Sequence, residues 1–159
     1  MGVYRPSRNI EASIIEFIRE ELAGDWTNIN VEKTFARIYD LKLPSICIRV
    51  GTTAHEKAEI GADSTTRTPQ VLIDIFCTSD GQRLDLKDFL IEKLKSGLPY
   101  YNYTIVNGQI QSKVQDGRIR VLTIDDAPVN FEADRDALDV HDRHRHALTL
   151  GVSLGRVET

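Results

Sequence analysis

The chain has 159 residues, of which 41% are hydrophobic and 28% charged, and its formal net charge is −4. This length suits one domain with a buried core, and the composition is ordinary for a globular protein. No run approaches the roughly 18–20 apolar residues of a membrane helix, and the acidic balance speaks against a generally basic nucleic-acid binder. We therefore expect residues 1–159 to form a single domain that does not contact a membrane.

The first predicted element is an amphipathic helix over residues 7–22, with Ser7 or Asn9 as its cap and Gly24 as its end. Apolar side chains recur at helical spacing along one face, namely Ile10, Ile14, Phe17, Ile18 and Leu22. This stripe predicts that the helix packs on other elements along that face.

Two strands and a polar stretch are predicted next. Residues 30–41 have strand-like composition, and residues 45–51 form a clearer strand of alternating pattern. Residues 51–68 are too many for a tight turn and too polar for the core, so we expect a projecting loop or β-arm used for contacts. The alternative is a tolerated surface excursion. The candidate contact residues in this stretch are Thr52, Thr53, His55, Lys57, Glu59 and Arg67.

Residues 71–97 carry the most informative pattern, an apolar strand followed by a capped helix. The strand is apolar on both faces, which is typical of a strand near the middle of a sheet. Ser79 and Gln82 match the capping box that starts a helix, and Gly97 lies where a left-handed stop belongs. The apolar face of the predicted helix consists of Leu86, Phe89, Leu90 and Leu94.

Two dipeptides that favour tight hairpin turns follow, Asn107-Gly108 and Asp116-Gly117. They predict a meander of three strands over residues 101–106, 109–115 and 118–124. The middle strand has few apolar residues and is therefore expected to be peripheral or protruding.

The acidic excess lies in residues 125–146, which hold seven acidic and three basic side chains, a net of −4. We expect an acidic loop over residues 125–142, anchored by Val129 and Phe131, and then a terminal strand. Charged side chains of this region are further candidates for contacts, namely Asp134, Asp136, Arg143 and Arg145.

Three histidines near the terminal strand, His141, His144 and His146, form the grouping that best suits a metal. Histidines two apart on a strand point the same way, but no further ligand or base is signalled, so interface or partly buried histidines are favoured. Cys47 and Cys77 lie in apolar strand patterns and are expected to be buried, reduced thiols. No nucleophile elbow or phosphate loop is present, and we expect no enzyme, metal or cofactor.

The order of these elements resembles small neck proteins of tailed bacteriophages, above all tail-terminator (tail-completion) proteins, with minor capsid or head-to-tail joining proteins nearby. The resemblance covers most of the chain and lies in the order of its elements and in the local sequence of several segments. The segments that carry it are LPSICIRVG, VLIDIFCTSDGQRLDLKDFLIEKL and HRHALTLGVSL.

The resemblance implies an α+β subunit, a mostly antiparallel sheet with two packed helices, that forms a homo-oligomeric ring, typically a hexamer. Such a ring sits on the head-proximal end of the tail tube, ends tube polymerisation and joins the tail to head-completion or connector proteins. Genomic DNA passes through its lumen without sequence readout. The protein would then be a structural component of the virion neck, assembled in the host cytoplasm.

Three alternatives stay open at this point. The chain could be a head-completion or connector-bound neck subunit, which belongs to the same class. It could instead be a metal-dependent enzyme that uses His141, His144 and His146, or a small intracellular binding module whose polar arm is the ligand loop.

Overall fold

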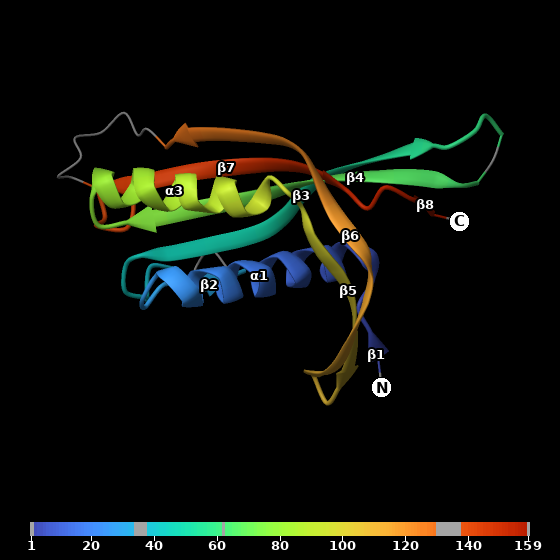
Figure 1. The fold of residues 1–159 in the computed structure, drawn as a ribbon, viewed down its shortest axis with the longest axis horizontal. Helices are drawn as coiled ribbons and strands as arrows, with labels where there is room; N and C mark the ends of the chain where they lie inside the picture. The colour runs from blue at the N-terminus through green and yellow to red at the C-terminus, as the bar shows by residue number, and fades with distance from the viewer. Residues whose placement is uncertain (1, 34–37, 62, 130–137, 159) are drawn as a thin grey trace.

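The computed structural model describes residues 2–33, 38–61, 63–129 and 138–158. Within them the chain forms two helices and an eight-stranded sheet (Figure 1). In chain order the elements are β1 (Gly2–Val3), α1 (Pro6–Asp25), β2 (Asn30–Glu32), β3 (Ser45–Lys57), β4 (Thr65–Cys77), α3 (Asp80–Leu94), β5 (Leu98–Val106), β6 (Gln109–Pro128), β7 (His144–Ser153) and β8 (Val157–Glu158).

The strands run in the order β1-β5-β6-β7-β4-β3-β2, with β8 added to β4. Every pairing among the described residues is antiparallel except that of β2 with β3. The structure therefore confirms the predicted α+β class with a mostly antiparallel sheet. β4 lies between β3 and β7, which confirms the central position inferred from its apolar residues.

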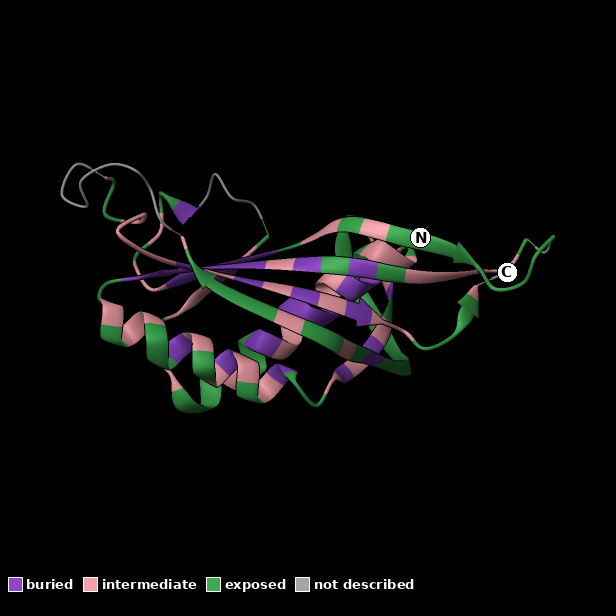
Figure 2. Cartoon of the chain, turned by 90° about the horizontal axis from the view of Figure 1, so that it is seen from above, coloured by how far each residue is buried: buried purple, intermediate pink, exposed green. Residues whose placement is uncertain are grey.

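Both helices contribute to one hydrophobic core with the sheet. α1 packs on β3 and β5, and α3 packs on β4 and β7. Trp26 at the end of α1 meets Phe89 of α3 edge to face, with ring centroids 6.0 Å apart. Figure 2 shows buried residues along the middle of the sheet and on the helices, whereas the ends of several strands are exposed.

The start and end of α1 differ from the prediction. The N-cap is Arg5, without a side-chain cap bond, and Pro6 opens the helix. Proline suits this position because its missing N–H would have no helical partner there. Asn9 is buried and bonds to β5, and Gly24 lies inside the helix, which continues to Asp25.

The predicted capping box of α3 is present with a shift of one residue. Ser79 Oγ accepts a hydrogen bond from the Gln82 N–H at 3.2 Å, as expected. The Gln82 side chain, however, accepts from the Thr78 N–H at 2.8 Å. Leu86, Leu90 and Leu94 are fully buried, and Gly97 adopts the left-handed conformation with φ +79°.

The predicted second hairpin is wrong, because β6 runs on from Gln109 to Pro128. Its first part pairs with β5 and its second part with β7. Asp116 and Gly117 together lie opposite Tyr100, so they form a bulge in which Gly117 has φ +96°. A bulge with a glycine in this conformation bends a strand without ending it. The half of β6 before the bulge is exposed, as predicted for a protruding strand.

The loop predictions are partly corrected. Of the predicted strand over residues 30–41, the described residues 30–33 and 38–41 contain only the short strand Asn30–Glu32. Residues 125–128, predicted as loop, belong to β6. The rest of the acidic loop includes residues 130–137, so Phe131, Asp134 and Asp136 lie outside the described residues.

Candidate functional site

β3 and β4 extend beyond the rest of the sheet as a β-arm, residues 51–68, which projects at one end of the molecule (Figure 1). Their pairing resumes after a bulge and continues from Thr53 opposite Pro69 to Lys57 opposite Thr65. β8 pairs with β4 at Thr65 and Thr66 within the arm. A bond from the Ala58 N–H to the Ser64 carbonyl, 2.9 Å, closes the tip. This confirms the projecting β-arm that the length and polarity of the segment predict.

Most candidate contact residues of the β-arm are accessible. Thr52, His55, Lys57 and Glu59 are exposed, and Thr53 is half-buried. In the described residues β2 pairs with β3 only at Ser45–Cys47, so the outer edge of β3 along the β-arm has no strand partner. An open strand edge of this kind is available to a partner.

Arg67 differs from the other candidates because it holds the base of the β-arm. Its Nε and Nη2 donate to the two carboxylate oxygens of Glu158 at 2.9 and 3.0 Å. Its Nη1 donates to Ser7 Oγ at 2.6 Å. One side chain thus ties the β-arm to β8 and to the first turn of α1.

Arg143 and Arg145 also lie within the subunit. Arg145 donates to Asp74 at 3.2 Å, and its guanidinium lies 4.9 Å from the Phe76 ring centroid. Arg143 donates to the Leu138 carbonyl at 3.2 Å. Both side chains are half-buried, and these bonds hold the turn before β7 against the sheet.

The three histidines do not converge on one point. His144 Nδ1 lies 3.1 Å from Asp80. His146 is buried, with Arg83 2.7 Å from its Nδ1 and Asp126 3.1 Å from its Nε2. His141 lies at the opposite face of the sheet beside Tyr39. Among the described residues, no three His, Cys, Asp or Glu side chains are placed to hold a metal ion.

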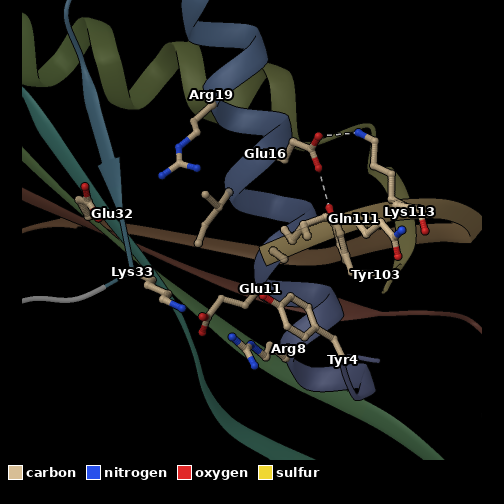
Figure 3. Close-up of a pocket in the computed structure, with 14 residues that line it drawn as sticks. Tyr4, Arg8, Glu11, Glu16, Arg19, Glu32, Lys33, Tyr103, Gln111 and Lys113 are labelled. Atoms are coloured by element: carbon tan, nitrogen blue, oxygen red, sulfur yellow. Dashed lines mark hydrogen bonds and ion pairs between the residues drawn. The ribbon is translucent and has the colours of Figure 1, made fainter. Parts of the chain in front are cut away.

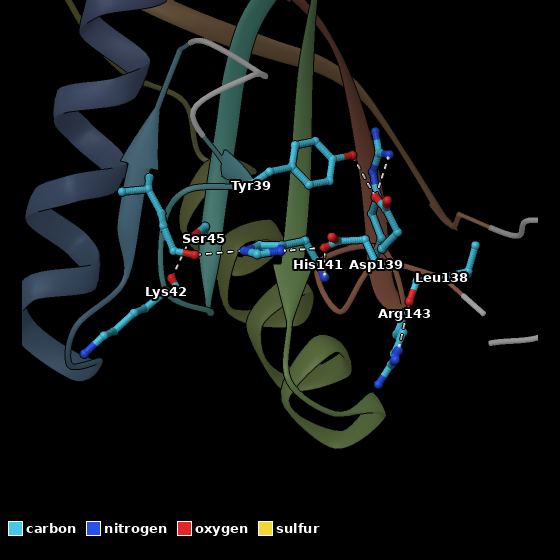
Figure 4. Close-up of polar contacts among 10 residues, drawn as sticks. Tyr39, Lys42, Ser45, Leu138, Asp139, His141 and Arg143 are labelled. Atoms are coloured by element: carbon cyan, nitrogen blue, oxygen red, sulfur yellow. Dashed lines mark hydrogen bonds and ion pairs between the residues drawn. The ribbon is translucent and has the colours of Figure 1, made fainter. Parts of the chain in front are cut away.

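His141 links two surface segments (Figure 4). Its Nδ1 lies 2.7 Å from Asp139 and its Nε2 lies 2.8 Å from the Leu41 carbonyl. Burial by itself lowers the pKa of this ring, but the bonds to Leu41 and Asp139 favour the doubly protonated form and leave the pKa above its usual 6.5. The charged ring can donate to both oxygens at once, whereas the neutral ring can donate to only one.

The raised pKa predicts a pH dependence of stability. The stabilisation from His141 is complete below the unfolded pKa of 6.5 and is lost as pH rises through the folded value. We expect wild type to lose about 0.2–1 kcal/mol more than His141→Gln above that range. Urea unfolding of both proteins from pH 6 to pH 9 measures this. His146 has a lowered pKa, mainly from burial, but it is present in both proteins and cancels in the comparison. Equal losses of stability in both proteins between pH 6 and pH 9 would contradict the assignment.

The cysteines are buried and free, as predicted. Burial raises the pKa of Cys47 to about 11 and that of Cys77 to about 12. Cys77 belongs to the main core, whereas Cys47 packs with Ile38 and Phe76 in a separate small cluster. Neither thiol is therefore an available nucleophile at neutral pH.

Sequence reasoning missed a groove of about 590 Å³ beside α1 (Figure 3). We call it the α1 groove. It lies between the outer side of α1, the end of β2 and the β5–β6 hairpin. Its lining residues are Tyr4, Arg8, Glu11, Ala12, Ile15, Glu16, Arg19, Glu32, Lys33, Tyr103, Ile110, Gln111, Ser112 and Lys113.

One wall of the α1 groove is fixed by Glu16. Its carboxylate accepts from Tyr103 Oη at 2.7 Å and pairs with Lys113. Burial raises the pKa of Glu16, but the bonds from Lys113 and Tyr103 outweigh burial and leave the pKa below its usual value. Glu16 is therefore ionised at neutral pH and links α1 to both strands of the β5–β6 hairpin.

Comparison with known proteins adds no assignment. No family model matches the chain, and no curated protein matches it. In the described part of the chain, no helix is long and apolar enough to cross a membrane.

Proposed function

We propose that this chain is a structural ring subunit of the tailed-phage neck, a tail terminator that ends tube polymerisation and joins the tail to head-completion proteins. The observation that carries the proposal is the β-arm, an ordered extension of two core strands with accessible polar side chains and one open edge. An extension of this kind buries little of its own surface against its subunit. We therefore expect another molecule to cover it.

A second exposed hairpin supports the same proposal. β6 before the bulge pairs with β5 on one side and has no described strand on the other. Its apolar side chains are exposed, with Ile110 at 51% and Val114 at 67%. Neighbouring copies that cover such edges would remove both the open backbone groups and the apolar area from water.

The remaining chemistry of the described residues favours a structural role over an enzyme. His141, His144 and His146 are bonded to separate partners, and both cysteines are buried. The metal-dependent alternative would require these histidines to leave those partners. Elemental analysis of the purified protein addresses it, since stoichiometric metal that is lost in His146→Ala would favour the enzyme.

The proposed role predicts assembly and recognition of tail tubes. We expect rings by light scattering and negative-stain microscopy, and we expect them at tube ends when tubes are added. A shortened variant replaces residues 58–64 with Asn-Gly, because Lys57 and Thr65 are opposite in register and a two-residue turn can join such a pair. This variant should fold, since it keeps Arg67, Glu158 and the β8 partners Thr65 and Thr66, but should not assemble.

Two outcomes would contradict the proposal. Rings that bind connectors and not tubes would assign the chain to a head-completion role. A protein that stays monomeric at high concentration, both with and without tubes, would favour the binding-module alternative.

A further inference from the structure

The tip of the β-arm presents an isoleucine to solvent. The Ile60 side chain is fully exposed, at 106%, the largest exposure among the large apolar residues described. Glu56 and Glu59 flank it, and neither has an ion-pair partner in the described part of the chain, whereas Lys57 and Asp63 lie 4.0 Å apart. Residues 56–63 hold three acidic side chains and one basic, a net of −2. The tip is therefore an apolar side chain within an acidic surround.

The α1 groove has the complementary character. Ala12 and Ile15 of α1 and Ile110 of the hairpin give it an apolar lining. Its volume of about 590 Å³ falls within the usual range of binding clefts, about 300–1,000 Å³. An isoleucine that entered it would remove its own apolar surface and that of Ile110 from water.

The charges of the α1 groove also complement the tip. Its lining includes four basic and three acidic side chains, a net of +1. Lys113 is already paired with Glu16. Arg19 donates to the Val31 carbonyl at 2.7 Å, and Arg8 lies 3.8 Å from the Tyr4 ring centroid. In the described part of the chain, neither of them nor Lys33 has a carboxylate partner, so their charges match those of Glu56 and Glu59 on the tip, which favours and orients docking.

The tip cannot reach the groove of its own subunit. The Val50 N–H donates to Glu11 of the groove at 3.2 Å, so the β-arm begins beside the groove and leads away from it. A strand advances about 3.3 Å per residue, so Lys57 lies roughly 23 Å beyond Val50. Ile60 lies further still, and bringing it back would require the paired strands of the β-arm to separate.

We propose that the β-arm tip of one subunit docks in the α1 groove of a second copy of this chain, with Ile60 against Ile110. The contact joins two different surfaces, and such heterologous contacts generate closed rings or open filaments. The inference rests on the proposed ring function and adds the surfaces through which the copies meet.

Cross-linking between two variants that each carry one added cysteine tests the contact. The Ile60→Cys protein is mixed with an affinity-tagged Ile110→Cys protein and oxidised. The tag makes a mixed disulfide dimer differ in mass from a dimer of two identical chains. A disulfide requires a Cα separation of about 4.4–6.8 Å, and the native cysteines are buried, so background is low. As a control, Ile60→Cys is mixed with tagged Leu84→Cys, whose added thiol lies at an exposed position on α3. We expect the Ile60→Cys and Ile110→Cys mixture to give about ten times more mixed dimer than this control.

Ile60→Asp provides a second measurement. Because this side chain is fully exposed, we expect unchanged thermal unfolding of the subunit but association at least about tenfold weaker. Leu84→Asp is the matched control and should assemble normally. This inference would be overturned if the wild type forms rings, the Ile60–Ile110 pair gives no excess cross-link and Ile60→Asp assembles normally. The ring function would then still stand. Wild-type monomers with and without tubes would overturn the ring function, and the inference with it.

Discussion

Replacement of Arg145 by methionine is expected to destabilise the folded subunit by about 3–5 kcal/mol. Arg145 Nη2 lies 3.2 Å from Asp74, and the two side chains are only 15% and 11% exposed. The guanidinium also covers the Phe76 ring. Methionine would fill part of this space but leave the Asp74 carboxylate without its partner in a site with little water, and an uncompensated buried charge is costly.

Urea unfolding of the subunit measures this loss, and Arg5→Met is the control. Arg5 is exposed at the start of α1, so its replacement should change the free energy of unfolding by less than about 0.5 kcal/mol. Asp74→Asn should also destabilise, and the double variant should lose less than the sum of the two single changes. Normal stability of Arg145→Met together with failed assembly would instead assign Arg145 to a subunit contact.

Local patterns predicted the centre of the fold well. The apolar run that begins at Val71 identified a central strand, and Ser79 and Gln82 identified the start of α3. Both signals act within a few residues, so the sequence displays them directly. Asp116-Gly117 led to the wrong prediction of a second hairpin turn, because the same dipeptide occurs in turns and in bulges. Only the pairing of β6 with β5 and β7 distinguishes the two.

The candidate contact surfaces were less predictable. The β-arm could be inferred from the length and polarity of residues 51–68, a property of one segment. The α1 groove could not, because its lining comes from α1, the end of β2 and the β5–β6 hairpin. The internal bonds of Arg67 and Arg145 were equally hidden, since their partners Glu158 and Asp74 are 91 and 71 positions away along the chain.

The second large effect is expected for Gly97→Ala, at the junction between α3 and β5. Gly97 has φ +79°, and a Cβ atom there would lie 2.7 Å from the Ile119 carbonyl oxygen. The left-handed conformation alone costs an ordinary residue about 1–3 kcal/mol, and the clash adds to it. Because Leu98 pairs with Ile119, relief of the clash would shift β5 against β6. We expect a loss of about 2–5 kcal/mol in the free energy of unfolding.

Gly24→Ala is the matched control, because the same change should have the opposite sign there. Gly24 lies inside α1, and beyond its chain neighbours and the backbone of its own helix turn no described atom would lie within 4 Å of an added Cβ. Alanine favours a helix over glycine by up to about 1 kcal/mol, so this variant should be slightly more stable than wild type. Equal losses in both variants would show that glycine content, rather than the junction at Gly97, governs stability. A loss confined to Gly97→Ala would identify that junction as the point that sets the β5–β6 hairpin, and with it one wall of the α1 groove.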